Sequence, residues 1–294
     1  MRITNRYDLP ASYVRAVSVQ RVAKPYTISV TQLIKPPQML ALELAHADEI
    51  VKDAADFIDM FFGTAVHHLL DHFGGPDAES EKVLVWEQDG WTIHGTPDHA
   101  EWLDLGEDAL LTDWKTTKVR ALAYDKPEWE QQVNLYVHLL RLNDVSVSAC
   151  QVWAFLKDWD KTKLGSDPEY PRAPLCLVLV PLWDAMTAHE FMLERLRLHA
   201  AALAEGAYGP CAPEERWQRS TWAVWSENGK PQTRAARVLA TEDEAEKWVE
   251  AASGEYRIEE RHGEPLRCQS YCDAAAFCGQ WGSERLQEAA AGVA

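Results

Sequence analysis

The alternation of apolar and polar residues predicts three antiparallel strands in the first half of the chain. They span residues 83–86, 91–103 and 109–113. The last two flank a polar turn at residues 104–108 that contains Gly106, so we expect them to form a β-hairpin. Because side chains alternate between the two faces of a strand, Asp113 and Lys115 should share one face and Trp114 should point to the other.

Helical periodicity separates these strands from further apolar runs. It predicts a helix opened by Pro36-Pro37, a second over residues 53–73, and a third capped by Asp125 that has Pro127 in its first turn and ends near residue 143. Strands at residues 145–156 and 175–182, the second expected to be central, precede a helix over residues 183–204. This order predicts an α/β fold, with a mixed sheet and helices on both of its faces.

The last third of the chain has its own pattern. Strands at residues 221–225 and 233–239 are expected to pair through a type I′ turn at Asn228-Gly229. Thr241 and Glu244 form a capping box for a helix to about residue 252, and a strand at residues 255–261 follows. We therefore expect four segments: a basic arm at 1–36, a core at 37–205, an accessory ββαβ subdomain at 206–265, and a cysteine-rich segment with a tail at 266–294.

Composition is compatible with a soluble cytoplasmic protein, since no apolar run is long enough to cross a membrane and no signal peptide is recognisable. The net charge of −17 argues against a broad nucleic-acid surface. The charge is uneven, however: residues 1–36 hold six Lys and Arg against the single acid Asp8, and another basic group, Lys115, Lys118, Arg120 and Lys126, follows the hairpin. These groups could form a local positive track, or they could be solvated charges without a partner.

Two acidic side chains of the hairpin have a chemical use. Asp98 near the start of its first strand and Asp113 at the end of its second offer hard oxygen ligands that suit Mg²⁺ or Mn²⁺. The ammonium of Lys115 beside them could activate a water molecule or stabilise the charge that builds up on a phosphate. The alternative is a surface hairpin that merely carries charged residues near its ends.

The predicted helix over residues 53–73 adds a possible nitrogen ligand. Gly63 and His67 are four residues apart and share a helical face, and the glycine leaves room for a neighbouring backbone or a metal in front of the histidine. His68 points about 100° away and is the weaker candidate. A lone histidine on a helix can also be simply packed or exposed, so only the hairpin favours His67 as a ligand.

Together these residues resemble a known family. Pro97-Asp98 followed by Asp113-Trp114-Lys115 resembles the signature of the PD-(D/E)XK nucleases. Gln132 and Tyr136, four residues apart, and Gly63–His67 resemble motifs of its RecB-type branch. A weaker resemblance to phage-encoded RecB-like nucleases extends over most of the chain. It implies a restriction-endonuclease-like core over residues 37–205.

The resemblance implies a metal-dependent deoxyribonuclease, most plainly an exonuclease, that acts in recombination, repair or replication, for example of a phage, beside a single-strand annealing protein. It implies that the metal is held by His67, Asp98, Asp113 and the backbone carbonyl of Trp114. Lys115 would position or activate the attacking water, and Gln132 and Tyr136 would fix Lys115 or the DNA backbone. Two alternatives remain, an inactive DNA-binding or assembly scaffold with this fold and a CRISPR-adaptation-like nuclease. No Gly-x-Ser-x-Gly or phosphate-binding Gly-x-x-x-x-Gly-Lys motif supports other chemistry.

Four of the six cysteines form a second candidate site. Cys268, Cys272 and Cys278 lie close together in the sequence. This spacing resembles the iron–sulfur staple of some RecB-type nucleases, in which a further cysteine precedes the core. Here that place holds Pro36-Pro37, and Cys211 is the best replacement ligand. Four thiolates suit a [4Fe–4S] cluster or, alternatively, Zn²⁺; three reduced thiols on a turn-rich segment are the other interpretation.

Overall fold

The computed structural model describes residues 1–19, 24–73, 78–80, 82–103, 108–165, 170–227 and 233–291. The chain divides into two compact units, one formed by Met1–Lys35 with Ala47–Ala207 and the other by Pro36–His46 with Tyr208–Ala294. This division differs from the four expected segments. The basic N-terminal residues belong with the core, whereas Pro36–His46, most of which we expected in the core, groups with the C-terminal residues.

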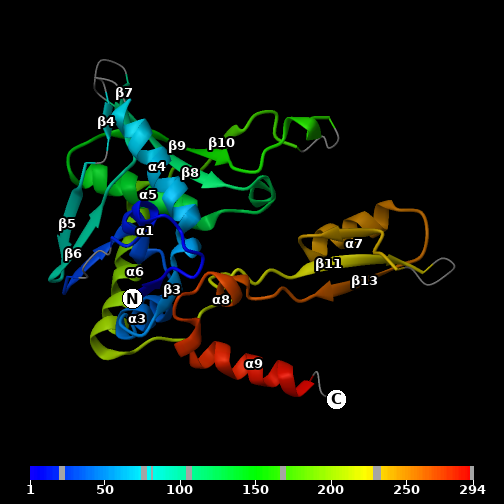
Figure 1. Cartoon of the computed structure of the whole chain (residues 1–294). Helices are drawn as coiled ribbons and strands as arrows, with labels where there is room; N and C mark the ends of the chain where they lie inside the picture. Colours follow the sequence, from blue (N-terminus) through cyan, green and yellow to red (C-terminus); the bar gives the residue numbers. More distant parts are fainter. Residues whose placement is uncertain are drawn as a thin grey trace. The chain divides into compact units, whose positions relative to one another are not determined.

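The first unit is built on a five-stranded mixed sheet (Figure 1). Its strands β8 and β9 run parallel, and the other neighbouring pairs are antiparallel. A parallel pair needs a crossover, which runs through helix α5. In spatial order the strands are β10 (Leu175–Leu179), β9 (Val147–Leu156), β8 (Asp108–Thr117), β7 (His99–Leu103) and β4 (Ala78–Ser80).

Helices cover the two faces of this sheet around β8, as the sequence pattern predicts. On one face α5 (Pro127–Leu142) lies against β8 and β9, with the buried side chains of Val133, Leu135 and Leu139 on the helix. Helix α4 (Ile58–His72) packs against β8 on the other face, where Gly63 lies beside the side chain of Thr116 (Figure 1). Helix α6 (Ala185–Glu205) packs against α5.

Smaller elements complete this unit. One sheet has the order β2 (Thr27–Ser29), β6 (Trp91–Gly95) and β5 (Leu84–Gln88), and another pairs β1 (Arg2–Thr4) with β3 (Val51–Asp53). The N-terminal residues are tied to the core rather than extended as an arm, because the buried carboxylate of Asp53 accepts hydrogen bonds from the Arg6 backbone N–H and the Thr4 hydroxyl, each at 2.8 Å. The short helices are α1 (Ala11–Val17), α2 (Val30–Leu33), η1 (Ala54–Phe57), η3 (Val119–Ala123) and η4 (Lys161–Lys163).

Three local expectations are wrong. Residues 91–103 are two strands in different sheets, β6 and β7, and the break falls at Pro97, which has no N–H for a strand ladder. Strand β10 is an edge strand rather than a central one, and Leu179 at its end is 79% exposed. The residue that precedes α5 as N-cap is Lys126 rather than Asp125. The predicted turns at Gly106 and Asn228-Gly229 lie outside the described residues.

The second unit contains a three-stranded antiparallel sheet in the order β12 (Arg237–Leu239), β11 (Thr221–Ser226) and β13 (Tyr256–Arg261). Helix α7 (Glu242–Ala251) packs against all three strands and begins at the expected capping box of Thr241 and Glu244. The remaining helices are α3 (Pro37–Ala45), α8 (Leu266–Ser270), η5 (Ala275–Phe277) and α9 (Gly279–Ala291). None of the helices in the described part of the chain is long and apolar enough to span a membrane.

Candidate active site

Strand β8 places the first two candidate residues. Because it lies in the middle of the five-stranded sheet, side chains on its α5 face are enclosed. Asp113 has no exposed surface, and the ammonium nitrogen of Lys115 lies 2.6 Å from its Oδ2 atom. Neither oxygen of Asp113 receives a well-aligned hydrogen bond from the described residues. The carboxylate is therefore buried and only partly compensated.

Helix α5 supplies a polar chain that leads to Lys115. The ammonium of Lys115 donates to Gln132 Oε1 at 3.0 Å, and Gln132 Nε2 donates to the hydroxyl of Tyr136 at 3.1 Å. Gln132 and Tyr136 lie one helical turn apart, which is why both reach the same line of contacts. The lysine side chain is thus held between a carboxylate from its own strand and an amide from the helix.

Gly95 makes room for this helix, and sequence reasoning missed it. A Cβ atom at this position would lie 2.9 Å from the Tyr136 ring and 2.9 Å from Leu139 Cδ1, closer than side chains tolerate. Glycine at the end of β6 therefore lets the Tyr136 ring lie against the backbone. A glycine inside a strand pattern is the signal that indicates such an approach. By contrast, a Cβ on Gly63 would make an ordinary 3.6 Å contact with Thr116 Oγ1, so of the two expected uses of this glycine, room for a backbone or for a metal, the first is not found among the described residues.

Asp98 and His67 complete the group from the opposite side of β8. Asp98 lies in the bend between β6 and β7, and its Oδ2 accepts the Trp114 backbone N–H at 2.8 Å. One nitrogen of the His67 ring lies 3.1 Å from Asp98 Oδ1, and the other lies 2.9 Å from the Trp114 carbonyl oxygen. The structure therefore brings the six residues of the sequence-based site together, whereas His68 is exposed on the surface of α4.

Electrostatics at the site follow from burial and from these contacts. Burial raises the pKa of Asp113 to about 6, against the opposing effect of the Lys115 ammonium. The pKa of His67 is raised above its ordinary value, first because Asp98 accepts a hydrogen bond from the ring. Both ring nitrogens of His67 face oxygen atoms, and only the doubly protonated ring can donate to both. Without a metal ion, the negative charge of Asp98 and Asp113 is therefore compensated by the Lys115 ammonium and by protonation of His67.

The donor set suits a hard divalent cation. Carboxylate oxygens of Asp98 and Asp113 and the carbonyl of Trp114 are the ligand types that suit Mg²⁺ and Mn²⁺, and the imidazole of His67 would add one nitrogen ligand. The buried Asp113 oxygens without aligned donors are the observation that fits such an ion. As the side chains stand, no three His, Cys, Asp or Glu residues within the described ranges are grouped tightly enough to hold a metal ion.

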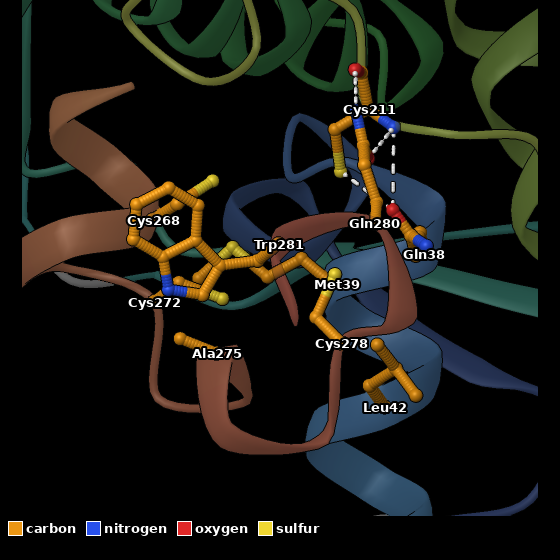
Figure 2. Close-up of a pocket in the computed structure, with 10 residues that line it drawn as sticks. All are labelled: Gln38, Met39, Leu42, Cys211, Cys268, Cys272, Ala275, Cys278, Gln280 and Trp281. Atoms are coloured by element: carbon orange, nitrogen blue, oxygen red, sulfur yellow. Dashed lines mark hydrogen bonds between the residues drawn. The ribbon is translucent and has the colours of Figure 1, made fainter. Parts of the chain in front are cut away.

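The four cysteines of the second candidate site lie in the second unit, around one hollow with an apolar lining. Figure 2 shows Cys268 and Cys272 near Trp281, while Cys278 and Cys211 lie at other parts of the lining. Gln38 and Gln280 hold Cys211: their Oε1 atoms accept its backbone N–H at 3.2 and 2.9 Å, and Gln280 Nε2 donates to its carbonyl at 3.1 Å. Trp281 and Met39 add to the lining (Figure 2).

Two of these thiols, those of Cys211 and Cys272, are neutral in the metal-free protein. Burial raises the pKa of Cys211 to about 12 and that of Cys272 to about 11. A metal centre would have to displace their protons, as metal binding to thiols normally does. Cys150 and Cys176 lie apart, on β9 and β10, where Cys150 is buried as a small apolar residue and Cys176 is only partly buried.

No curated protein is similar enough to count as a match. Among solved structures, the crystal structure of SSO0001 shares 17% sequence identity, covers 64% of this chain and 82% of its own, and gives a TM-score of 0.44. Residues 41–279 match the PD-(D/E)XK nuclease superfamily, which is most of the chain. The chain therefore belongs to the PD-(D/E)XK nuclease superfamily.

Proposed function

We propose that this protein is a metal-dependent deoxyribonuclease in which His67, Asp98, Asp113 and the Trp114 carbonyl hold Mg²⁺ or Mn²⁺. The single observation that carries the proposal is the Asp113 carboxylate, which is fully buried beside Lys115 without an aligned hydrogen-bond donor among the described residues. A buried carboxylate is costly unless its charge is compensated. A divalent cation would supply that compensation and would also explain why three further metal-ligand types lie next to it.

Each residue has a role that follows from its contacts. When bound, the metal polarises the scissile phosphate and lowers the pKa of the attacking water. Lys115 orients that water and stabilises the charge that develops on the phosphate. Asp113 and Gln132 hold the ammonium of Lys115 from two directions, and Tyr136 fixes the amide of Gln132. Such positioning lowers the barrier because the reacting groups need not be ordered during the reaction.

We further propose that the substrate is DNA and that cleavage proceeds from an end. The resemblance of the Gly63–His67, Gln132 and Tyr136 motifs to RecB-type nucleases supports an exonuclease. It also supports a role in recombination, repair or replication, in a phage or its bacterial host, beside a single-strand annealing protein.

Digestion of end-labelled DNA tests this proposal. Single- and double-stranded substrates, linear and circular, would be incubated with Mg²⁺, Mn²⁺ or EDTA. We expect loss of linear DNA with a metal, survival of circular DNA, and no cleavage in EDTA. Asp113→Ala and Lys115→Ala should abolish cleavage. Glu101→Gln is the matched control, because this carboxylate lies on the neighbouring strand β7 but is exposed.

The outcomes separate the parts of the proposal. Cleavage by both variants at the parental rate would show that the site is wrongly assigned. Rapid cutting of circular DNA would replace the exonuclease with an endonuclease. A parental protein that binds DNA but never cuts it with either metal would favour the inactive scaffold.

We also propose that Cys211, Cys268, Cys272 and Cys278 hold a [4Fe–4S] cluster rather than Zn²⁺. A single Zn²⁺ at about 2.3 Å from each sulfur gathers its thiolates tightly, whereas a cluster keeps them further apart because iron and sulfide lie between them. The four thiols line one hollow, and the resemblance of their spacing to the iron–sulfur staple of RecB-type nucleases favours the cluster.

Anaerobic purification followed by iron, sulfide and zinc analysis tests the cluster. We expect about four irons per chain by the definition of the cluster, and loss of them in Cys211→Ser. Cys176→Ser is the control, since this cysteine lies on β10, away from the four. Stoichiometric zinc without iron, or no metal, would overturn this part of the proposal.

A further inference from the structure

Within the described ranges, helix α7 packs against one face of the three-stranded sheet of the second unit. Helix α7 covers the face of Tyr256, because Trp248 on the helix contacts the Tyr256 ring with 5.1 Å between ring centroids. Pairing of β11 with β13 places Trp225 opposite Arg257, and alternation directs this pair to the other face. We call that other face the open face; it carries Thr221, Ala223, Trp225, Arg257, Glu259 and Arg261.

Trp225 is the centre of the open face. The guanidinium carbons of Arg257 and Arg261 each lie 5.3 Å from the centroid of its ring, a distance typical of cation–π contacts. Ala223 on the same face is fully buried, although no helix covers it, which fits a flat indole lying over it. The buried indole N–H of Trp225 has no acceptor among the described residues. The partly exposed Trp225 ring, its unsatisfied N–H and the guanidinium groups of Arg257 and Arg261 therefore lie close together.

Charge distinguishes the two faces of this small domain. The acidic residues concentrate on helix α7, which carries Glu242, Asp243, Glu244, Glu246 and Glu250. On the open face two arginines stand against Glu259. Arg257 does pair with Glu259 at 2.7 Å, but both side chains are about half exposed, and such surface pairs are weak and easily exchanged for another anion.

The same unit presents a second group of this kind beyond the strands. Arg267, on α8 just after β13, lies 4.3 Å from the centroid of the Trp217 ring. Tyr271 packs edge-on against Trp217 at 5.1 Å and is 62% exposed. The chain leaves β13 toward α8, the helix that carries Arg267 (Figure 1).

We propose that the open face binds single-stranded DNA. Sheet surfaces with partly exposed aromatic rings bind unpaired nucleotides by stacking, while arginines contact the backbone. Such rings cannot reach bases that are stacked inside a duplex, and an acidic peptide would need the two arginines but not the aromatic ring beside them. That the bound strand belongs to the DNA being cleaved rests on the proposed function. Binding of the strand to the open face does not, because Asp113 and its neighbours take no part in that binding.

Fluorescence anisotropy with a labelled oligo-dT strand tests the proposal, with the full chain in EDTA so that cleavage cannot occur. We expect Trp225→Ala to weaken binding roughly tenfold, the usual effect of losing one stacked base. Arg257→Gln with Arg261→Gln should weaken binding and lower the slope of log K against log salt by about 1.4, since each lost phosphate contact contributes about 0.7. The matched control is Arg237→Ala, an exposed arginine of the same sheet that is in register with Val224 and so lies on the α7 face.

Further arms keep the result unambiguous. On an abasic strand of equal length the Trp225→Ala effect should vanish, whereas the effect of the double arginine variant should remain. If Trp225→Ala lowers thermal stability, its loss of binding could come from misfolding. The affinity and salt dependence of the double arginine variant then decide whether the open face binds DNA. Equal affinity of all variants for oligo-dT would overturn the proposal, as would a loss of binding in Arg237→Ala as large as in the arginine pair. Binding of a labelled oligo-glutamate peptide, with no binding of labelled oligo-dT, would overturn the proposal and assign the face to an acidic protein instead.

Discussion

Replacement of Asp113 by Asn should stabilise the metal-free fold at pH 8 while it abolishes cleavage. The side chain has no exposed surface, and burial raises its pKa to about 6 from the ordinary 3.8. Above pH 6 the folded chain therefore holds an ionised group that is disfavoured by roughly 3 kcal/mol, since each pKa unit corresponds to about 1.4 kcal/mol. Asparagine has nearly the same shape without the charge. After the lost contact with Lys115 is considered, we expect a net gain of about 1–3 kcal/mol.

The pH dependence has a definite sign. Because the pKa of Asp113 is higher in the folded state than in the unfolded state, the parent takes up a proton on folding between the two values and gains stability as the pH falls from about 7 to 4. The variant lacks this gain. Its advantage should be complete at pH 8 and should disappear near pH 4.

Urea unfolding followed by circular dichroism in EDTA measures both effects, with Glu101→Gln as the exposed control. Addition of Mn²⁺ should stabilise the parent, because a ligand that binds only the folded state raises its stability, and should leave Asp113→Asn unchanged. If Asp113→Asn is less stable than the parent at pH 8 in EDTA, the claim that the ionised Asp113 carboxylate destabilises the metal-free fold is refuted.

Three further predictions concern the Gln132–Tyr136 pair, the two glycines at positions 95 and 63, and Asp53. Gln132→Leu should lower kcat by at least about tenfold, because it removes a hydrogen bond to the charged ammonium of Lys115. Tyr136→Phe should lower kcat only a few-fold. Single-turnover cleavage separates both effects from substrate binding. Gly95→Ala should destabilise the fold by about 1–3 kcal/mol through overpacking, whereas Gly63→Ala, with ordinary contacts in a helix, should be neutral or slightly stabilising in thermal melts. The hydrogen bonds to Asp53, chiefly from the Arg6 backbone N–H, lower its pKa to about 2. Asp53→Asn should therefore destabilise the protein at pH 7. The parent should lose stability as the pH falls from 4 to 2, whereas this variant should lose less.

Local rules were sufficient to predict much of the site. The two-residue period of strands places Asp113 and Lys115 on one face, and the four-residue spacing on a helix brings Gln132 and Tyr136 to the same line of contacts. These relations depend on only a few neighbouring residues. The approach of Asp98 to the Trp114 backbone N–H depends on strand pairing across two sheets, and no sequence pattern indicated it.

Other features could not be predicted because they depend on long-range packing. The apolar run that ends at Leu179 is typical of a central strand, but nothing in the run shows whether a further strand pairs beside it. The need for glycine at position 95 arises from a helix that begins more than thirty residues later. Similarly, the grouping of Pro36–His46 with the C-terminal unit follows from contacts that no local pattern encodes.

Binding of Mn²⁺, measured by electron paramagnetic resonance of the free ion in the presence of the protein, tests the central claim most directly. The claim is that His67, Asp98 and Asp113 share one divalent ion beside Lys115. The account predicts that the parent and Lys115→Met remove Mn²⁺ from solution, since the lysine is not a ligand, whereas Asp113→Ala and Asp98→Ala lose this binding. Equal Mn²⁺ binding by the parent and by both aspartate variants would contradict it.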